Sequence, residues 1–335
     1  MRVVICGGGV IGACTAYFLC RRGIDVIVVE RTDVAAAASG KAGGFLALDW
    51  CAGSPLDALA RRSFALHAAL PDEIPGDWGY RRMTAYSGFV APERDGRRQV
   101  PAELDWLSDG VIIASRLGTA ETTAIVHPRA FTTAMMNAAQ GHGAELRRGR
   151  ITGIVRRADG STVGGVEVDD GVIEADAVVI AMGPWTMMAA GWLALPAVLG
   201  QRSPSLVYDD VPAHALFLDY HPENGASVIV EVFPRANGNT LVTAFSDQRP
   251  LPFDPAAVAP EPGEMDRLQT IGQRLSPMFR PERIIARQAC FRPVIQGGLP
   301  LIGKVPQIEG VYVATGHNVW GILNAPATGE ARWPS

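Results

Sequence analysis

The chain has 335 residues, of which 48% are hydrophobic and 19% are charged, and its net charge at pH 7 is −4. This composition excludes a disordered or collagen-like polymer and predicts a globular protein of about two domains. The slightly acidic charge, without a basic stripe, argues against a nucleic-acid partner, because such partners are bound through their phosphates.

The cysteines give no sign of a disulfide framework or of a metal site. They are odd in number and include no C-x-x-C pair: Cys6, Cys14, Cys20, Cys51 and Cys290. Free thiols are typical of a reducing compartment. The N-terminus also begins at once with a strand pattern, which leaves no room for a secretion signal. We therefore expect a cytoplasmic protein without a bound metal.

The first thirty residues predict one βαβ unit. Residues 3–6 and 26–30 have the pattern of buried strands, and residues 11–22 have the pattern of a helix that stops at Gly23. A strand, a turn and a helix in this order are what a nucleotide-binding fold requires.

A glycine-rich turn joins the first predicted strand to the helix. Residues 7–12 read Gly-Gly-Gly-Val-Ile-Gly and fit G-x-G-x-x-G. In this pattern Gly7 allows the tight turn, Gly9 lets the backbone approach a pyrophosphate, and Gly12 lets the helix pack on the strand. Glu30 ends the second strand, where a carboxylate can bind both ribose hydroxyls and disfavours the 2′-phosphate of NADP. The turn predicts dinucleotide binding and leaves NAD and FAD open.

Further elements are expected to return to the same sheet. Residues 128–141 predict a helix, and residues 151–156, 165–168 and 177–181 predict strands. The uncharged stretch 177–200 is as long as a membrane span. However, a Gly-Pro turn at 183–184 and Pro196 predict a strand, a turn and a short helix instead, so no membrane span is expected.

Two stretches differ from the remainder of the chain. Residues 46–125 and 201–284 are richer in proline, aromatic residues and alternating strands such as 215–220 and 228–232. They predict one discontinuous antiparallel substrate domain, and segments 1–45, 126–200 and 285–335 would form the cofactor domain. The fold class is thus a mixed α/β protein with a Rossmann-like dinucleotide-binding domain. The proline-rich run 250–262 predicts a solvated loop without chemistry.

Motifs that follow one another from residue 2 to 329 identify a family. Besides the glycine turn they are segments 38–44 (Ala-Ser-Gly-Lys-Ala-Gly-Gly), 151–155, 181–185, 292–293, 298–303, 314–322 and 325–329. Together they resemble the D-amino-acid oxidase, glycine oxidase and sarcosine oxidase family of FAD-dependent oxidoreductases. The Gly-Lys-Ala-Gly-Gly-Phe-Leu form also resembles a plant and fungal branch of poorly characterised oxidoreductases.

The resemblance implies FAD as the cofactor and assigns residues to it. The glycine turn would surround the pyrophosphate, Glu30 would hold the adenosine ribose, and the glycines at 43 and 44 would admit the flat isoalloxazine ring. Ile151 and Gly183 are equally consistent with core packing. The expected FAD contacts are Gly7, Gly9, Val10, Ile11, Gly12, Glu30, Arg31, Ser39, Gly40, Lys41, Ala42, Gly43, Gly44, Ile151, Gly183, Gly316, Asn318, Gly321 and Ile322.

Arg292 is the expected catalytic residue. The resemblance implies that its guanidinium anchors a substrate carboxylate at the flavin face and so places the Cα–H over flavin N5 for hydride transfer. An internal ion pair is the alternative. Arg235 is expected to be a solvated arginine at a strand end, and a second substrate contact is the alternative. His317 is expected to be a packing histidine, and a titrating role is the alternative.

Cys290 and the C-terminus bear on how FAD is held. Cys290 matches a cysteine that is bonded to the flavin 8α carbon in the sarcosine oxidase branch, but the Arg-Pro pair at 292–293 favours the non-covalent glycine oxidase branch. In the relatives a helix follows the motif that matches residues 325–329. Here Pro334 forbids much more helix, which predicts an altered or truncated C-terminus and puts flavin affinity in doubt.

The predicted function is oxidation of the C–N bond of an amino acid or secondary amine by hydride transfer to FAD. The partner would be this small molecule, and the oligomeric state is left open. Two alternatives stand beside it. One is a catalytically silent flavin-binding interaction protein, and the other is an NAD-dependent dehydrogenase.

Overall fold

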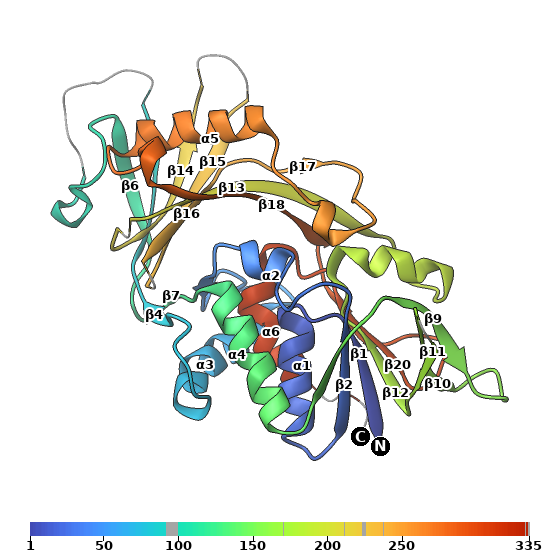
Figure 1. The fold of residues 1–335 in the computed structure, drawn as a ribbon. Coiled ribbons are helices and arrows are strands. Elements are labelled where there is room, and N and C mark those ends of the chain that lie inside the picture. The colour runs from blue at the N-terminus through green and yellow to red at the C-terminus, as the bar shows by residue number, and fades with distance from the viewer. Residues whose placement is uncertain are drawn as a thin grey trace.

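The computed structural model describes residues 1–91, 100–169, 171–210, 212–222, 226–236, 238–331 and 333. Its first layer is a six-stranded sheet with the strand order β19-β20-β12-β1-β2-β8 (Figure 1). In that order the strands span Leu301–Lys304, Val311–Thr315, Ala177–Ile180, Arg2–Cys6, Asp25–Glu30 and Glu145–Arg148. All are parallel except β19, which is antiparallel to β20. The carboxyl ends of the parallel strands therefore meet at one edge, where ligands of such sheets bind.

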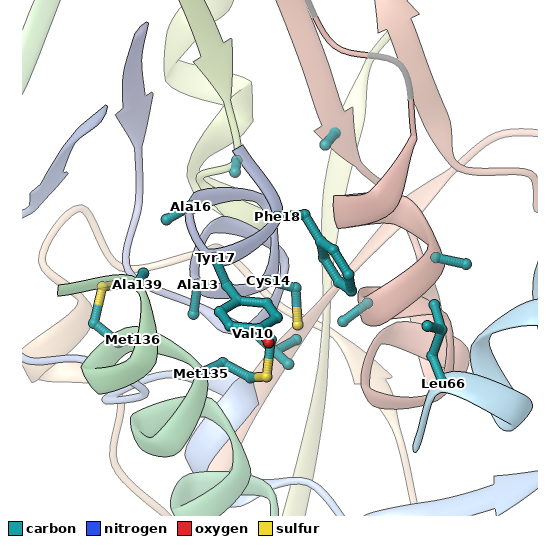
Figure 2. Packing of buried hydrophobic residues seen from close by; sticks show 14 of the residues in the cluster. Val10, Ala13, Cys14, Ala16, Tyr17, Phe18, Leu66, Met135, Met136 and Ala139 are labelled. Carbon is teal, nitrogen blue, oxygen red and sulfur yellow. The ribbon is translucent and has the colours of Figure 1, made fainter. Parts of the chain in front are cut away.

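Helices cover one face of this sheet. They are α1 (Val10–Cys20), α4 (Pro128–Gly141), α6 (Gly321–Glu330) and, packed against α6, α3 (Asp57–Glu73). Figure 2 shows side chains of α1 and α4, among them Tyr17 and Met135, gathered in one buried cluster. The predicted βαβ unit is confirmed by this arrangement. Its helix begins one residue earlier and ends two residues earlier than predicted.

A small sheet and a 3-10 helix lie against the other face. Strands β9 (Ile151–Arg156), β10 (Val163–Val168) and β11 (Gly171–Glu174) form a separate antiparallel sheet. Their apolar side chains share a core cluster with the outer face of β1 and β2. Residues 151–156 and 165–168 were predicted to return to the first sheet, and this was wrong. The third predicted strand, β12 (Ala177–Ile180), does return to it.

The uncharged stretch 177–200 follows the predicted sequence of elements. After β12 the chain forms a 3-10 helix over Gly183–Gly191, and the next strand begins at Val198. No helix within the described ranges is both long enough and apolar enough to cross a membrane.

The second layer is an eight-stranded sheet, which lies above the first in Figure 1. Its path is β17-β13-β16-β15-β14-β5-β6, and β18 pairs with β13. The strands are β17 (Asp247–Gln248), β13 (Val198–Tyr208), β16 (Asn239–Thr243), β15 (Val228–Arg235), β14 (Ala215–Tyr220), β5 (Ala85–Val90), β6 (Val111–Gly118) and β18 (Ile284–Ile295). Helix α5 (Pro262–Leu275) packs on one face. The pairs are antiparallel, as predicted, except for the parallel pair of β14 and β5.

The second sheet includes residues outside the segments predicted for it. β13 begins at Val198, and β18 pairs with it from Ile284 to Ile295, although residues from 285 onward were assigned to the cofactor domain. Conversely, α3 packs into the core around α1 although it belongs to segment 46–125. More segments thus lie in the other layer than predicted, and the division into two domains stays a prediction.

Short elements link the two layers. Strands β3 (Phe45–Ala47), β7 (Thr123–Ile125) and β4 (Arg81–Arg82) form a small antiparallel sheet. A four-residue helix, α2 (Ala38–Lys41), precedes β3. The remaining short 3-10 helices are Ala102–Leu104, Pro255–Ala257, Pro281–Arg283 and Asn318–Trp320.

Helix α6 corrects the expectation for the C-terminal motif. Residues 325–329 lie inside α6 and do not precede a helix. Pro326 stands within this helix and has no N–H for the carbonyl of Ile322, four residues earlier. The buried His67 of α3 contacts this carbonyl through Nε2 at 2.9 Å, and the next amide, Ala327 N–H, donates to Ser63 Oγ at 2.9 Å. Side chains of α3 thus replace the partners that proline removes.

We expect His67 to be neutral at pH 7 because it is buried, and donation to the Ile322 carbonyl places its proton on Nε2. Burial lowers its pKa from 6.5 to about 4, so its contribution to stability is fully present above pH 6.5 and is lost as the pH falls toward 4. Replacement His67→Phe should lower the free energy of unfolding at pH 7 by ~1–3 kcal/mol, since a buried carbonyl loses its donor. It should also flatten the decline of stability between pH 6.5 and 4.

Chemical denaturation at several pH values measures both effects. The exposed His142 provides the control variant His142→Gln. An unaltered unfolding free energy for His67→Phe would show that α6 does not need the bond.

Candidate functional site

A cavity of about 720 Å³ lies at the carboxyl edge of the parallel strands. Its lining includes Gly7 after β1, Glu30 at the end of β2, Ala181 after β12 and Thr315 at the end of β20. Residues of β13, β15, β16 and β18 line the cavity as well. The cavity is therefore enclosed by both layers of the molecule.

The glycine turn has the conformation that its pattern predicts. Gly7 has φ +115°, and a Cβ there would stand 2.5 Å from the Ala181 carbonyl oxygen. A Cβ on Gly12 would stand 2.0 Å from the Gly7 carbonyl oxygen. Gly12 does not line the cavity, so its role is close packing between helix and turn. Gly9 does line it, together with Val10 and Ile11 at the start of α1.

The N-terminus of α1 faces the cavity with little capping. Gly9 offers no side chain as a cap, and Ser39 Oγ accepts the Val10 N–H at 2.9 Å. The helix dipole and the first amides favour a negatively charged group at this place. This arrangement fits a pyrophosphate.

Glu30 is held at the end of β2. One carboxylate oxygen, Oε2, accepts the Gly8 N–H at 2.6 Å, and Oε1 accepts the backbone N–H of Thr32 at 2.8 Å and its hydroxyl at 2.9 Å. A carboxylate offers about four acceptor sites, so capacity remains for hydroxyl donors from the cavity. The position fits the predicted ribose contact.

Segment 39–44 lines the cavity except at Gly40. Gly43 and Gly44 line the cavity, so their contact with the isoalloxazine ring stays a prediction, and their missing side chains also make room for protein. A Cβ on Gly43 would stand 2.2 Å from the Phe233 ring, and one on Gly44, at φ +87°, would stand 2.0 Å from the Val126 carbonyl oxygen. A Cβ on Gly40 would meet the Ala35 carbonyl oxygen at 2.0 Å.

Arg235 supports this segment, and the expectation that it is solvated was wrong. The residue is only 3% exposed. Its Nη2 donates to the Ala42 carbonyl at 2.6 Å, and its Nη1 donates to Asn239 Oδ1 at 3.2 Å. Burial lowers the pKa of the guanidinium to about 10. Arg235 thus fixes the loop from the second sheet.

Arg292 lies in the lining of the cavity. Its Nη1 donates to Asn318 Oδ1 at 2.8 Å, and its buried Nε has no partner among the described residues. The pKa of Arg292 is lowered, because the effect of burial is larger than the opposing effects of Cys290 and Glu231. The alternative of an internal ion pair is not found within the described ranges, because the contact is to a neutral amide.

The other predicted contacts divide between lining and packing. Ile151, Gly183, Asn318, Gly321 and Ile322 line the cavity, as do Arg31 and Lys41. Gly183 has φ +55°, and a Cβ there would have no atom within 4 Å, so the turn leaves open space. Gly316 does not line the cavity, because its missing side chain faces Ile295.

His317 is buried, as expected for a packing histidine. Its Nε2 lies 3.1 Å from Thr328 Oγ1, and burial lowers its pKa to about 4. The ring is therefore neutral at physiological pH.

Cys290 and Lys41 lie near one another in the lining. Burial raises the pKa of the Cys290 thiol, and the positive charge of Lys41 opposes this rise. The Lys41 ammonium donates to the Ala289 carbonyl at 3.0 Å, and burial lowers its pKa. The described residues contain no group of three or more histidine, cysteine or acidic side chains that could hold a metal ion.

Sequence reasoning missed an aromatic wall in the cavity, which we define as Phe45, Trp50, Phe217, Phe233 and Trp320. The Phe217 ring lies 5.0 Å from Trp50 and 5.2 Å from Phe45, both in edge contacts. Glu231 on β15 was missed as well. The alternation in residues 215–220 and 228–232 indicates which side chains share a face, but it does not say which face meets the cavity.

The loop over residues 250–262 contacts this site, contrary to expectation. The Arg31 guanidinium donates to the Phe253 carbonyl at 2.6 Å, and Trp185 Nε1 donates to the Pro252 carbonyl at 2.9 Å. Pro255 lines the cavity. The loop thus covers part of the cavity near the end of β2.

Comparisons with known proteins agree with this geometry. Residues 2–331 match the family model described as FAD dependent oxidoreductase, DAO. An oxidoreductase of Schizosaccharomyces pombe is 28% identical over 98% of this chain and 92% of its own length. Glycine oxidase of Geobacillus kaustophilus is 26% identical over 98% of this chain and 90% of its own. The crystal structure of glycine oxidase from that organism superposes with a TM-score of 0.79, covering 98% of this chain and 92% of that one.

Two glycine variants should separate cofactor binding from folding. Gly12→Val should lower both stability and flavin content, because its side chain would clash with the Gly7 carbonyl. Gly9→Ala should lower flavin content with little loss of stability, since its Cβ would meet only Ser39 Oγ, at 3.2 Å. Absorbance of the purified yellow protein gives FAD per chain, and thermal unfolding gives stability.

Gly141→Ala is the control for both variants, because a Cβ at Gly141 would meet no atom within 4 Å. Full FAD occupancy in Gly12→Val and Gly9→Ala would contradict the assignment of this turn to the cofactor.

Proposed function

The chain belongs to the family of FAD-dependent oxidoreductases, and on that premise we propose that it oxidises the C–N bond of an amino acid or secondary amine. Arg292 carries the proposal. Its guanidinium lines the cavity, and the hydrogen bond that the described residues give it is to one neutral amide. An arginine fork of this kind suits a carboxylate in two parallel hydrogen bonds.

The residues around Arg292 would orient the substrate. Asn318 holds one arm of the guanidinium, so little side-chain freedom is lost when a carboxylate binds. The aromatic wall excludes water from the space beside it and strengthens the charge-assisted contact. Bound FAD would supply the acceptor for the hydride that leaves the substrate Cα. Positioning of the reactants is then the main contribution of the protein.

The relatives support this class of substrate. Glycine oxidase is similar to this chain in both sequence and structure over almost the whole length. The alternative of an NAD-dependent dehydrogenase has no support from the family, whose cofactor is FAD. We propose that the partner is the amine or amino acid alone. We also propose a cytoplasmic location, because the five free and buried cysteines would stay reduced there.

Anaerobic addition of amino acids and secondary amines to the purified protein tests the activity. Bleaching of the flavin absorbance is expected with at least one of them. A flavin that no amine bleaches would favour the catalytically silent flavin-binding protein.

Arg292→Met should raise the substrate concentration for half-maximal bleaching, while flavin content and absorbance stay nearly unchanged. Loss of a desolvated charge-assisted pair costs ~2–5 kcal/mol of binding. Amines without a carboxylate should be affected much less. Arg287→Met, an exposed position of the same strand, is the control. Equal losses for amines and amino acids would indicate a structural role.

FAD is expected to be bound non-covalently, since the Cys290 thiol is buried and its pKa is raised, which disfavours the reactive thiolate. Acid precipitation should release the yellow colour into the supernatant. Colour that stays in the pellet and disappears with Cys290→Ser would refute this expectation.

A further inference from the structure

Glu231 projects from the second sheet into the cavity. It stands in β15 between Ile229 and Phe233, and all three line the cavity. Its cross-strand partners are Phe217 on β14 and Thr243 on β16, which line the cavity too. Side chains of paired residues lie on the same face of a sheet. Glu231 is thus a carboxylate in the middle of a mostly apolar cavity wall.

Among the residues that the structure describes, none neutralises this carboxylate at close range. Within the described ranges Glu231 has no hydrogen bond or ion pair, and burial raises its pKa. The positive charge of Arg292 opposes that rise, so the two groups act on each other without a direct contact. The other carboxylates in the lining, Glu30 and Asp33, lie at and after the end of β2, beside the predicted ribose.

A partly desolvated carboxylate without a partner is costly, and such groups are normally paired. A ligand that carries a positive charge would remove this cost. Arg292 already offers the site for a negative charge, so the two residues together match a zwitterion. An α-amino acid has its ammonium and carboxylate on one carbon, which suits two opposite charges that share one cavity.

We propose that Glu231 binds the substrate ammonium group and accepts its proton before oxidation, which makes the substrate an α-amino acid held between Glu231 and Arg292. This inference rests on the proposed function. The proton leaves the nitrogen for a Glu231 oxygen, and the N–H electron pair stays on nitrogen. Bound FAD would supply the acceptor for the Cα–H of the neutral amine, which would leave as hydride with both electrons of that bond while the nitrogen lone pair forms the C=N bond.

The aromatic wall limits which amino acids fit. Phe217 lies directly across from Glu231, and its ring contacts Trp50 and Phe233. Apolar side chains or N-alkyl groups would pack on these rings, and aromatic faces attract an ammonium group as well. A second carboxylate would be repelled by Glu231. We therefore expect apolar amino acids to be preferred over aspartate and glutamate.

The other titratable groups of this part of the cavity do not replace Glu231. Lys41 donates to the Ala289 carbonyl, Arg292 is a guanidinium that donates to Asn318, and His317 is buried with its pKa lowered to about 4. The Cys290 thiol has a raised pKa and is protonated at neutral pH. Glu231 is left as the carboxyl group of this part of the cavity that can take up the proton.

The test compares two probes that cannot be oxidised. 2-Aminoisobutyrate has no Cα–H, and pivalate has a methyl group in place of its ammonium. Their dissociation constants for the FAD-loaded protein are measured from the change in flavin absorbance. Glu231→Gln should weaken 2-aminoisobutyrate roughly 10- to 100-fold, as for the loss of a hydrogen bond to a charged group, and should leave pivalate unchanged or tighter.

A second measurement follows the proton. Flavin bleaching by the best amino acid should slow in Glu231→Gln at pH 7 and recover at high pH, where the free amine is already neutral. Glu231→Asp should retain part of the wild-type behaviour. Asp219→Asn is the control, since Asp219 is an exposed carboxylate of the neighbouring strand that does not line the cavity.

Equal losses for both probes in Glu231→Gln, or bleaching that does not recover at high pH, would overturn the role of Glu231. If that variant does not fold, wild-type protein that binds succinate as tightly as butyrate would overturn it. Wild-type protein that no amine bleaches would overturn the proposed function instead, and the probe affinities would still report on Glu231.

Discussion

Backbone-to-backbone contact between the first and the last helix is the constraint on which the cavity depends. A Cβ on Gly329 of α6 would stand 2.5 Å from the Cys14 carbonyl carbon of α1, so only glycine allows this approach. The contact brings the segment from Asn318 to Ile322 to the same edge of the sheet as the glycine turn. The two ends of the chain therefore build the predicted cofactor site together, although more than three hundred residues separate Gly9 from Gly321.

The second sheet closes the cavity by polar contacts to one loop. Arg235 donates to the Ala42 carbonyl, and Gln288 donates to the Lys41 carbonyl at 3.2 Å. Lys41 returns a hydrogen bond to β18 through the Ala289 carbonyl. Lys41 ends α2 and Ala42 follows it, and carbonyls at the C-terminal end of a helix need such donors because they have no partner within the helix. The strands that make these hydrogen bonds, β15 and β18, also carry Glu231 and Arg292. The bonds therefore also fix how far these two side chains lie from segment 39–44.

What the sequence could predict depends on how far apart the interacting residues lie. The strand, turn and helix that end at Glu30 are one local unit, and the glycine spacing already contains their geometry. The burial of Arg235 depends on a carbonyl 193 residues away, which no local pattern indicates. The pairing of β18 with β13 and the parallel pair of β14 with β5 are likewise long-range choices. For Glu231, alternation predicted the pleat of β15, but only the packed sheet decides that its face meets the cavity.

The position of β1 in the middle of its sheet has a consequence for the order of folding. β1 pairs with β2, its neighbour in sequence, and also with β12, which the chain reaches about 170 residues later; β20 must then add beyond β12. Until β12 and β20 arrive, one edge of β1 has no partner, and the part of α1 that packs on α6 stays uncovered until α6 follows. Long-range pairing of this kind is slow, because loop-closure entropy is lost before the contacts form. During that interval the nascent N-terminal unit exposes an apolar surface and an unpaired strand edge. Chaperones that bind apolar segments would protect this unit from aggregation.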